Sequence, residues 1–86
     1  MPTVEIYTTQ SCPYCVKAKM LLDRKGAKYT EHKISFHDTA AMEAMMKRAN
    51  GRRTVPQIFI GDSHVGGCDD LYALESAGKL DGMLNR

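Results

Sequence analysis

The spacing of apolar residues changes several times along this chain, and each change predicts a new secondary-structure element. Residues 3–8 alternate in polarity and carry β-branched side chains, which is typical of a strand. Pro13 suits the first position of a helix, and Gly26 suits its end. The apolar face of that helix is expected to comprise Tyr14, Ala18, Leu21 and Leu22. Residues 28–33 alternate weakly and predict a second strand.

A second helix is predicted after a short polar segment. Asp38 and Thr39 form its expected N-cap pair, and Asn50-Gly51 its expected stop. Its apolar stripe comprises Met42, Met45, Met46 and Ala49. We interpret these methionines as core filler rather than as a metal site, because the flexible thioether side chain packs well in irregular spaces.

The last third of the chain predicts a strand, a hairpin turn, a return strand and two helical segments. We expect them, in that order, at residues 57–60, 61–62, 64–65, 69–77 and 80–84. The first of these helices would open at Asp69-Asp70 and end at Gly78, with an apolar face made of Leu71, Leu74 and Ala77.

The resulting order, β-α-β-α-β-β-α, defines the fold class as α/β. A βαβ unit pairs its strands in parallel through a right-handed crossover, whereas a hairpin is antiparallel. The prediction is therefore a mixed four-stranded sheet flanked by helices. The length of 86 residues fits one domain over residues 1–86.

Composition excludes several classes of function. Twelve basic and ten acidic residues give a net charge of +2, too balanced to indicate nucleic-acid binding. No apolar run is long enough to span a membrane, and we expect no secretion leader. Three cysteines are too few for a secreted disulfide framework. We therefore expect a cytoplasmic protein.

The sequence Cys12-Pro13-Tyr14-Cys15 lies where the first strand gives way to the first helix. Free N–H groups and the dipole of a helix N-terminus favour a thiolate, so Cys12 is the expected nucleophile and Cys15 the resolving thiol. Tyr14 has two readings that stay open, either beside the substrate sulfur or facing the core. The alternative of a zinc site needs four ligands, and no second cysteine or histidine pair supplies them.

Two further segments carry candidate chemistry. Thr54-Val55-Pro56 precedes a strand, and a cis bond before Pro56 would leave the backbone of Val55 open to an extended peptide. Gly66-Gly67-Cys68-Asp69-Asp70 precedes a helix, where N–H groups could hold a carboxylate and acidic side chains an ammonium group. On these residues alone, a plain helix cap is the favoured reading of the second segment.

Together these three motifs resemble the dithiol glutaredoxins, and most closely the small bacterial proteins of the glutaredoxin-three type. The resemblance extends from the first strand to the final helix. It implies a thioredoxin fold with cis-Pro56, no bound cofactor, and glutathione as reductant and co-substrate. It also implies a glutathione groove formed by Tyr14, Arg52, Thr54, Val55, Pro56, Gly67, Cys68, Asp69 and Asp70.

Within that groove the resemblance assigns separate roles. Val55 would pair its backbone with the cysteinyl part of glutathione, and Arg52 would reach the glycine carboxylate. The γ-glutamyl end would lie against Gly67, Cys68 and Asp69, with Asp70 a weaker candidate. Protein disulfides such as that of ribonucleotide reductase would be substrates of a monomeric enzyme, without nucleic acid or membrane partners.

One position departs from the family pattern. Many members carry a lysine three residues before the first active-site cysteine, where this chain has Thr9. Lys17, Lys19 and Arg52 are the candidates to replace its charge. Cys68 is expected to be a buried small hydrophobic residue, and regulation through its oxidation is the alternative if it is exposed and acidic. The histidines are expected at the surface, with His64 nearest the groove.

Two rival functions stay open from the sequence. One is a dimer that shares an iron–sulfur cluster through Cys12 and glutathione, although such proteins usually lack the Pro-Tyr pair. The other is an electron carrier reduced by thioredoxin reductase, against which the glutathione-binding residues argue. Visible absorbance of the purified protein tests the first, and turnover without glutathione tests the second.

Overall fold

The computed structural model describes residues 2–85, which form four strands and four helices. In chain order they are β1 (Val4–Thr8), α1 (Pro13–Arg24), β2 (Tyr29–Lys33), α2 (Thr39–Arg48), β3 (Gln57–Ile60), β4 (Ser63–Gly66), α3 (Cys68–Ser76) and α4 (Leu80–Leu84). The predicted order of elements is confirmed. Among the residues described, no helix has the length and apolarity needed to cross a bilayer.

The strands form one sheet in the order β2-β1-β3-β4. β1 pairs with β2 in parallel, and β3 pairs with both β1 and β4 in antiparallel fashion. The predicted mixed sheet is therefore confirmed, including the hairpin at Gly61, whose φ of +58° suits glycine. The pairing of β3 with β4 shifts by one residue between Ile58 and Phe59. Ile58 pairs with Gly66, and Phe59 pairs with His64 rather than with Val65.

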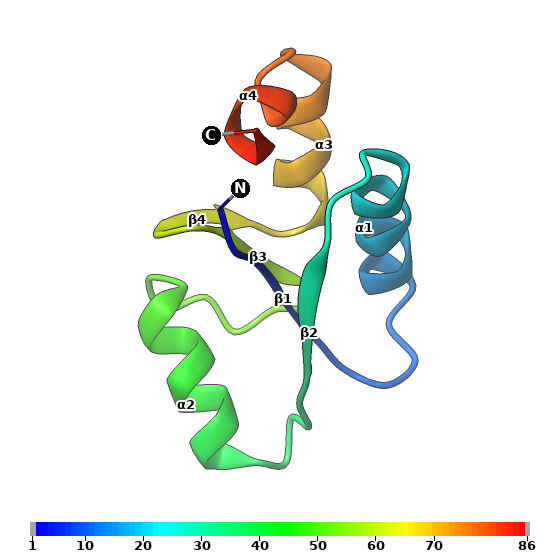
Figure 1. Cartoon of the computed structure of the whole chain (residues 1–86). Helices are drawn as coiled ribbons and strands as arrows, with labels where there is room; N and C mark the ends of the chain where they lie inside the picture. The colour runs from blue at the N-terminus through cyan, green and yellow to red at the C-terminus, as the bar shows by residue number, and fades with distance from the viewer. Residues whose placement is uncertain (1, 86) are drawn as a thin grey trace.

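The two faces of the sheet are covered differently (Figure 1). α1 and α3 lie on one side of the sheet, and α2 lies on the other. Alternation along β1 sends Val4, Ile6 and Thr8 to buried positions and leaves Glu5 and Tyr7 on the face toward α2. The main core between the sheet and α1, α3 and α4 comprises Val4, Ile6, Ala18, Leu21, Leu22, Ala27, Ile58, Ile60, Cys68, Leu71, Leu80 and Leu84.

Local sequence signals set most helix ends. Cys12 is the N-cap of α1 and precedes Pro13, and Gly26 follows the helix with φ +69°. Asp38 caps α2 through a bond of 3.1 Å from the N–H of Ala41 to its carboxylate. The predicted methionine stripe of α2 is confirmed as packing, because Met42 and Met45 are buried together with Ala49.

Three details differ from the sequence prediction. α3 begins at Cys68 with Gly67 as its N-cap, one residue before the predicted Asp69-Asp70. Ala77 is exposed, because it is the C-cap residue where the chain leaves the helix and the helical spacing no longer holds. Tyr14 is 60% exposed, because the first turn of α1 borders an open groove, and this excludes only the core-facing one of its two readings.

Candidate active site

The two thiols of the Cys-x-x-Cys motif lie at the start of α1 and are joined in a disulfide. Their Cα atoms are 5.2 Å apart, an ordinary separation for a disulfide. Cys12 Sγ accepts a hydrogen bond of 3.1 Å from the backbone N–H of Cys15, as the sequence predicted for a helix N-terminus. The same donor would stabilise a Cys12 thiolate in the reduced protein.

The two sulfurs differ in accessibility. Cys15 lies one turn into α1 and is 2% exposed, whereas Cys12 is only half-buried. An incoming disulfide therefore meets Cys12 first. Cys15 is placed to attack Cys12 from within the protein. The division into a nucleophile, Cys12, and a resolving thiol, Cys15, stays a prediction.

The segment before β3 brings a second motif to this pair. The Val55–Pro56 peptide bond is cis, as the family resemblance implied. Cys12 Sγ lies 4.0 Å from the carbonyl oxygen of Val55, although 43 positions separate them in the sequence. The backbone of Val55 is thereby placed beside the reactive sulfur, where an extended substrate could pair with it.

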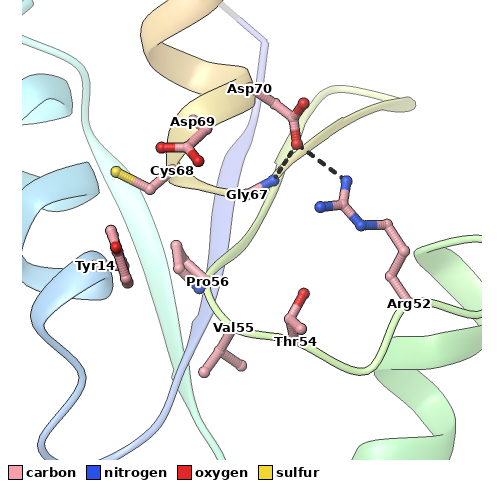
Figure 2. A pocket seen from close by; sticks show the side chains of 9 residues that line it. All are labelled: Tyr14, Arg52, Thr54, Val55, Pro56, Gly67, Cys68, Asp69 and Asp70. Atoms are coloured by element: carbon pink, nitrogen blue, oxygen red, sulfur yellow. Dashed lines mark hydrogen bonds and ion pairs between the residues drawn. The ribbon is translucent and has the colours of Figure 1, made fainter.

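A groove of about 330 Å³ extends from this point toward the N-terminus of α3 (Figure 2). It is lined by the nine residues that the sequence analysis grouped as a binding site: Tyr14, Arg52, Thr54, Val55, Pro56, Gly67, Cys68, Asp69 and Asp70. Figure 2 shows Tyr14 at the α1 side, the Thr54–Pro56 segment below and Arg52 at the opposite end. The groove is large enough for a ligand of peptide size.

The far end of the groove is closed by an ion pair. Arg52 Nη1 donates to Asp70 Oδ2 at 3.0 Å, and the backbone N–H of Gly67 donates to the same oxygen at 2.9 Å. The bond from Gly67, followed by the one from Arg52, lowers the pKa of Asp70. The cap reading of this segment is confirmed, because Asp70 caps α3. Gly67, Cys68 and Asp69 also line the groove, and their binding role stays a prediction.

Cys68 belongs to the core. It is 4% exposed, and burial raises the pKa of its thiol. The prediction of a buried small hydrophobic residue is confirmed. Regulation through oxidation would need an exposed and acidic thiol, and Cys68 is neither.

Each of the three candidates to replace the charge that Thr9 lacks has another partner in the structure. Lys19 pairs with Glu31 at 3.0 Å, the ammonium of Lys17 lies 5.0 Å from the ring centre of Tyr72, and Arg52 pairs with Asp70. All three candidates therefore have partners other than Cys12. The helix N-terminus remains the identified source of stabilisation for a Cys12 thiolate.

Gln57 and His64 are two polar residues next to the groove for which no role was predicted. Gln57, the first residue of β3, is fully buried and bonds to Thr54 and His64. The signal available in the sequence was an amide residue standing between Pro56 and an otherwise apolar strand. Across residues 2–85, no three His, Cys, Asp or Glu side chains are grouped as metal ligands would be.

A sheet whose cis-proline segment faces a helix-capping Cys-x-x-Cys pair defines a thiol–disulfide oxidoreductase of the thioredoxin fold. Comparison with known proteins makes this assignment specific. The family model named Glutaredoxin matches residues 4–65. The chain belongs to the glutaredoxin family.

Two curated relatives match over nearly their whole length. The glutaredoxin of Pseudomonas aeruginosa is 55% identical over 85 residues, which cover 99% of this chain and 99% of the relative. Glutaredoxin 3 of Escherichia coli is 55% identical over 84 residues, which cover 98% and 99% respectively. The predicted likeness to the glutaredoxin-three type is therefore confirmed.

Solved structures agree with this family and fold. The buckwheat glutaredoxin–glutathione complex superposes with a TM-score of 0.87 at 34% identity, covering 98% of this chain and 77% of that one. The solution structure of glutaredoxin from Brucella melitensis has a TM-score of 0.83 at 55% identity, covering 98% and 89%. The predicted thioredoxin fold is confirmed.

Proposed function

We propose that this protein uses glutathione to reduce protein disulfides and glutathione mixed disulfides through the Cys12/Cys15 pair. The observation that carries the proposal is the groove that runs from Val55, beside Cys12 Sγ, to the Arg52–Asp70 ion pair. The structural relative solved as a glutathione complex supports the same ligand.

The groove offers a partner for each part of the tripeptide. The backbone of Val55, before cis-Pro56, pairs with the cysteinyl residue and places its sulfur near Cys12. The exposed N–H groups at the start of α3 take the γ-glutamyl carboxylate, and Asp69 takes its ammonium group. Arg52 takes the glycine carboxylate. Tyr14, Thr54, Gly67, Cys68 and Asp70 complete the walls.

In the dithiol route the Cys12 thiolate attacks one sulfur of a protein disulfide. A Cys12–substrate disulfide forms, and the other substrate sulfur leaves as a thiolate. Cys15 then loses its proton, attacks Cys12 Sγ and releases the second substrate thiolate, which leaves the Cys12–Cys15 disulfide. Two glutathione thiols reduce it in sequence, so that two electrons pass from glutathione to the substrate and oxidised glutathione departs.

The monothiol route needs Cys12 alone. Cys12 attacks the glutathionyl sulfur of a glutathionylated protein, forms a Cys12–glutathione disulfide and releases the protein thiolate. A second glutathione thiolate then attacks the glutathionyl sulfur, which releases oxidised glutathione and the Cys12 thiolate. By the family resemblance, ribonucleotide reductase is one protein substrate. We place this chemistry in the cytoplasm, because a disulfide-forming pair needs a reducing pool to be used again. We also propose that the protein acts as a monomer.

The test is turnover of a glutathione mixed disulfide, coupled to glutathione reductase, for wild type and two variants. Cys12→Ser should lose activity by on the order of 10³-fold or more, because the nucleophile is absent. Cys15→Ser should retain this reaction but lose reduction of an intramolecular protein disulfide. Equal loss of both reactions in Cys15→Ser would contradict the two routes. If thioredoxin reductase reduces the wild-type protein without glutathione, that reductase rather than glutathione is the electron source.

A further inference from the structure

The buried side chain of Gln57 holds the segment that bears Val55. Gln57 Nε2 donates to the carbonyl oxygen of Thr54 at 2.9 Å and to its hydroxyl at 3.2 Å. The side chain has no exposed surface, and a buried amide without partners would be costly. Gln57 therefore ties the first residue of β3 to the residue before Val55.

The direction of these bonds fixes the state of His64. A backbone carbonyl only accepts hydrogen bonds, so the NH₂ group of Gln57 must face Thr54 and its Oε1 must face His64. His64 Nε2 lies 2.7 Å from Oε1 and therefore carries the proton. His64 Nδ1, 3.3 Å from Asn50 Nδ2, then accepts from that amide. A neutral imidazole protonated on Nε2 satisfies the whole chain of bonds.

The sheet register explains why these residues meet. His64 lies opposite Phe59, and their rings stack with centroids 5.0 Å apart. Gln57 is two residues before Phe59 and therefore points to the same face of β3. The pair His64 and Gln57 is a diagonal contact across the two strands. Burial, followed by the charge of Arg52, lowers the pKa of His64, in keeping with a neutral ring.

We infer that His64 and Gln57 are positioning residues, which hold the Thr54–Val55 backbone in the conformation that the groove needs for its ligand. Hydrogen bonds run from Asn50 through both side chains to Thr54, so the segment that follows α2, the β3–β4 hairpin and the cis-proline segment are joined at a residue that lines the groove. The identity of the ligand, glutathione, rests on the function proposed above. Neither residue touches the reacting sulfurs.

The decisive variant is His64→Phe, which keeps an aromatic ring to stack on Phe59 but removes the donor to Gln57. The variant also loses the bond from Asn50, which is exposed to solvent. We expect KM for the glutathione mixed disulfide to rise about three- to tenfold with kcat nearly unchanged, as the loss of the more buried bond to Gln57 would give. His64→Gln restores a donor and should recover most of the loss.

His32→Phe is the matched control. His32 also contacts an aromatic ring, that of Tyr7 with centroids 4.7 Å apart, but its hydrogen bond goes to Glu5 on β1 rather than to Gln57. Its KM should match that of wild type. Alkylation of Cys12 by iodoacetamide should proceed at the same rate in all these variants, because the nucleophile itself is unaltered.

A second readout needs no glutathione. In ¹⁵N relaxation measurements on the ligand-free protein, the amides of Thr54 and Val55 should show lower order parameters in His64→Phe than in wild type or His32→Phe. Long-range ¹⁵N spectra of wild type should show the Nε2-protonated tautomer of His64.

The outcomes separate this inference from the proposed function. The positioning role is supported if His64→Phe has a raised KM and lower order parameters while His32→Phe matches wild type in both. Unchanged KM and order parameters would overturn it while leaving glutathione-dependent activity intact. If wild type shows no glutathione turnover, the proposed function fails, and the order parameters and the tautomer then decide on the positioning role by themselves.

Discussion

Gly66 ends β4 with φ +114°, a conformation that favours glycine. A Cβ at this residue would collide with the carboxylate of Asp70 and would lie 2.7 Å from Arg52 Nη1. The absent side chain therefore leaves space for the ion pair that closes the groove. Glycine is therefore required at this position for two reasons: the positive φ, and the space that Asp70 and Arg52 occupy.

Gly66→Ala should raise KM for the glutathione mixed disulfide, because the Arg52–Asp70 pair must move. The positive φ should also cost about 1–2 kcal/mol of unfolding free energy. Gly26→Ala separates the two effects, since Gly26 has φ +69° and open space where a Cβ would lie. It should lose similar stability in urea unfolding and keep its KM. An unchanged KM in Gly66→Ala would show that the ion pair does not shape the groove.

At the scale of elements, α2 is fastened to the sheet by Arg48 near its C-terminus. The guanidinium bonds both carboxylate oxygens of Glu5, at 3.1 and 2.8 Å, and the hydroxyl of Tyr7 at 2.8 Å. It also lies 4.1 Å from the ring centre of Phe59. Hydrogen bonds from Arg48 and His32 lower the pKa of Glu5 to about 2. This attachment holds the C-terminal end of α2 against the sheet.

Arg48→Gln should lower the unfolding free energy at pH 7 by about 1–2 kcal/mol, because three charged hydrogen bonds of the guanidinium are lost together. The ordinary pKa of Glu5 is 4.5 and its folded value is about 2, so its ionised form adds stability above pH 4.5. That contribution is lost as the pH falls toward 2. The difference between wild type and variant should therefore shrink over this range in urea unfolding.

Arg24→Gln is the control for this charge, because Arg24 is exposed at the end of α1. It should change stability by less than about 0.5 kcal/mol at every pH. A gap between Arg48→Gln and wild type that stays constant down to pH 2 would contradict the role given to Glu5.

At the scale of the whole molecule, the helices divide unevenly over the sheet (Figure 1). The main core joins the sheet to α1, α3 and α4, and the ion pairs of Lys25 with Glu75 and Asp81, both 2.9 Å, connect these three helices. α2 covers the other face alone, with Met42 and Met45 as its buried residues. Less apolar surface is therefore buried by α2 than by the helices opposite.

Native-state hydrogen exchange should show this difference. The amides of α2 should open with a lower free energy than those of β1 and α1, because fewer buried contacts hold the helix in place. Arg48→Gln should lower the opening free energy of α2 more than that of α1. Amides of α2 that exchange only through global unfolding would contradict this expectation.

The sequence predicted what short segments decide by themselves. Strand alternation, the helical stripe of Met42 and Met45, the capping of α2 by Asp38 and the glycine at the end of α1 all depend on neighbours within a few residues. The order of these elements then left few topologies for the sheet. The reactive pair was also readable, because the same four residues hold both thiols and the start of a helix.

Only the tertiary structure decided the questions that depend on distant residues. Tyr14 fits a helical apolar face in the sequence, but the groove beside α1 leaves it exposed. The contact between Gln57 and His64 requires the shifted register of the hairpin, which no local pattern specifies. Cys12 meets the carbonyl of Val55 because the sheet brings together the ends of two strands that are far apart in the chain. The sequence shows which side chains can carry the chemistry, because each short motif is complete in itself. The groove forms only when folding brings together α1, the segment before β3 and the start of α3.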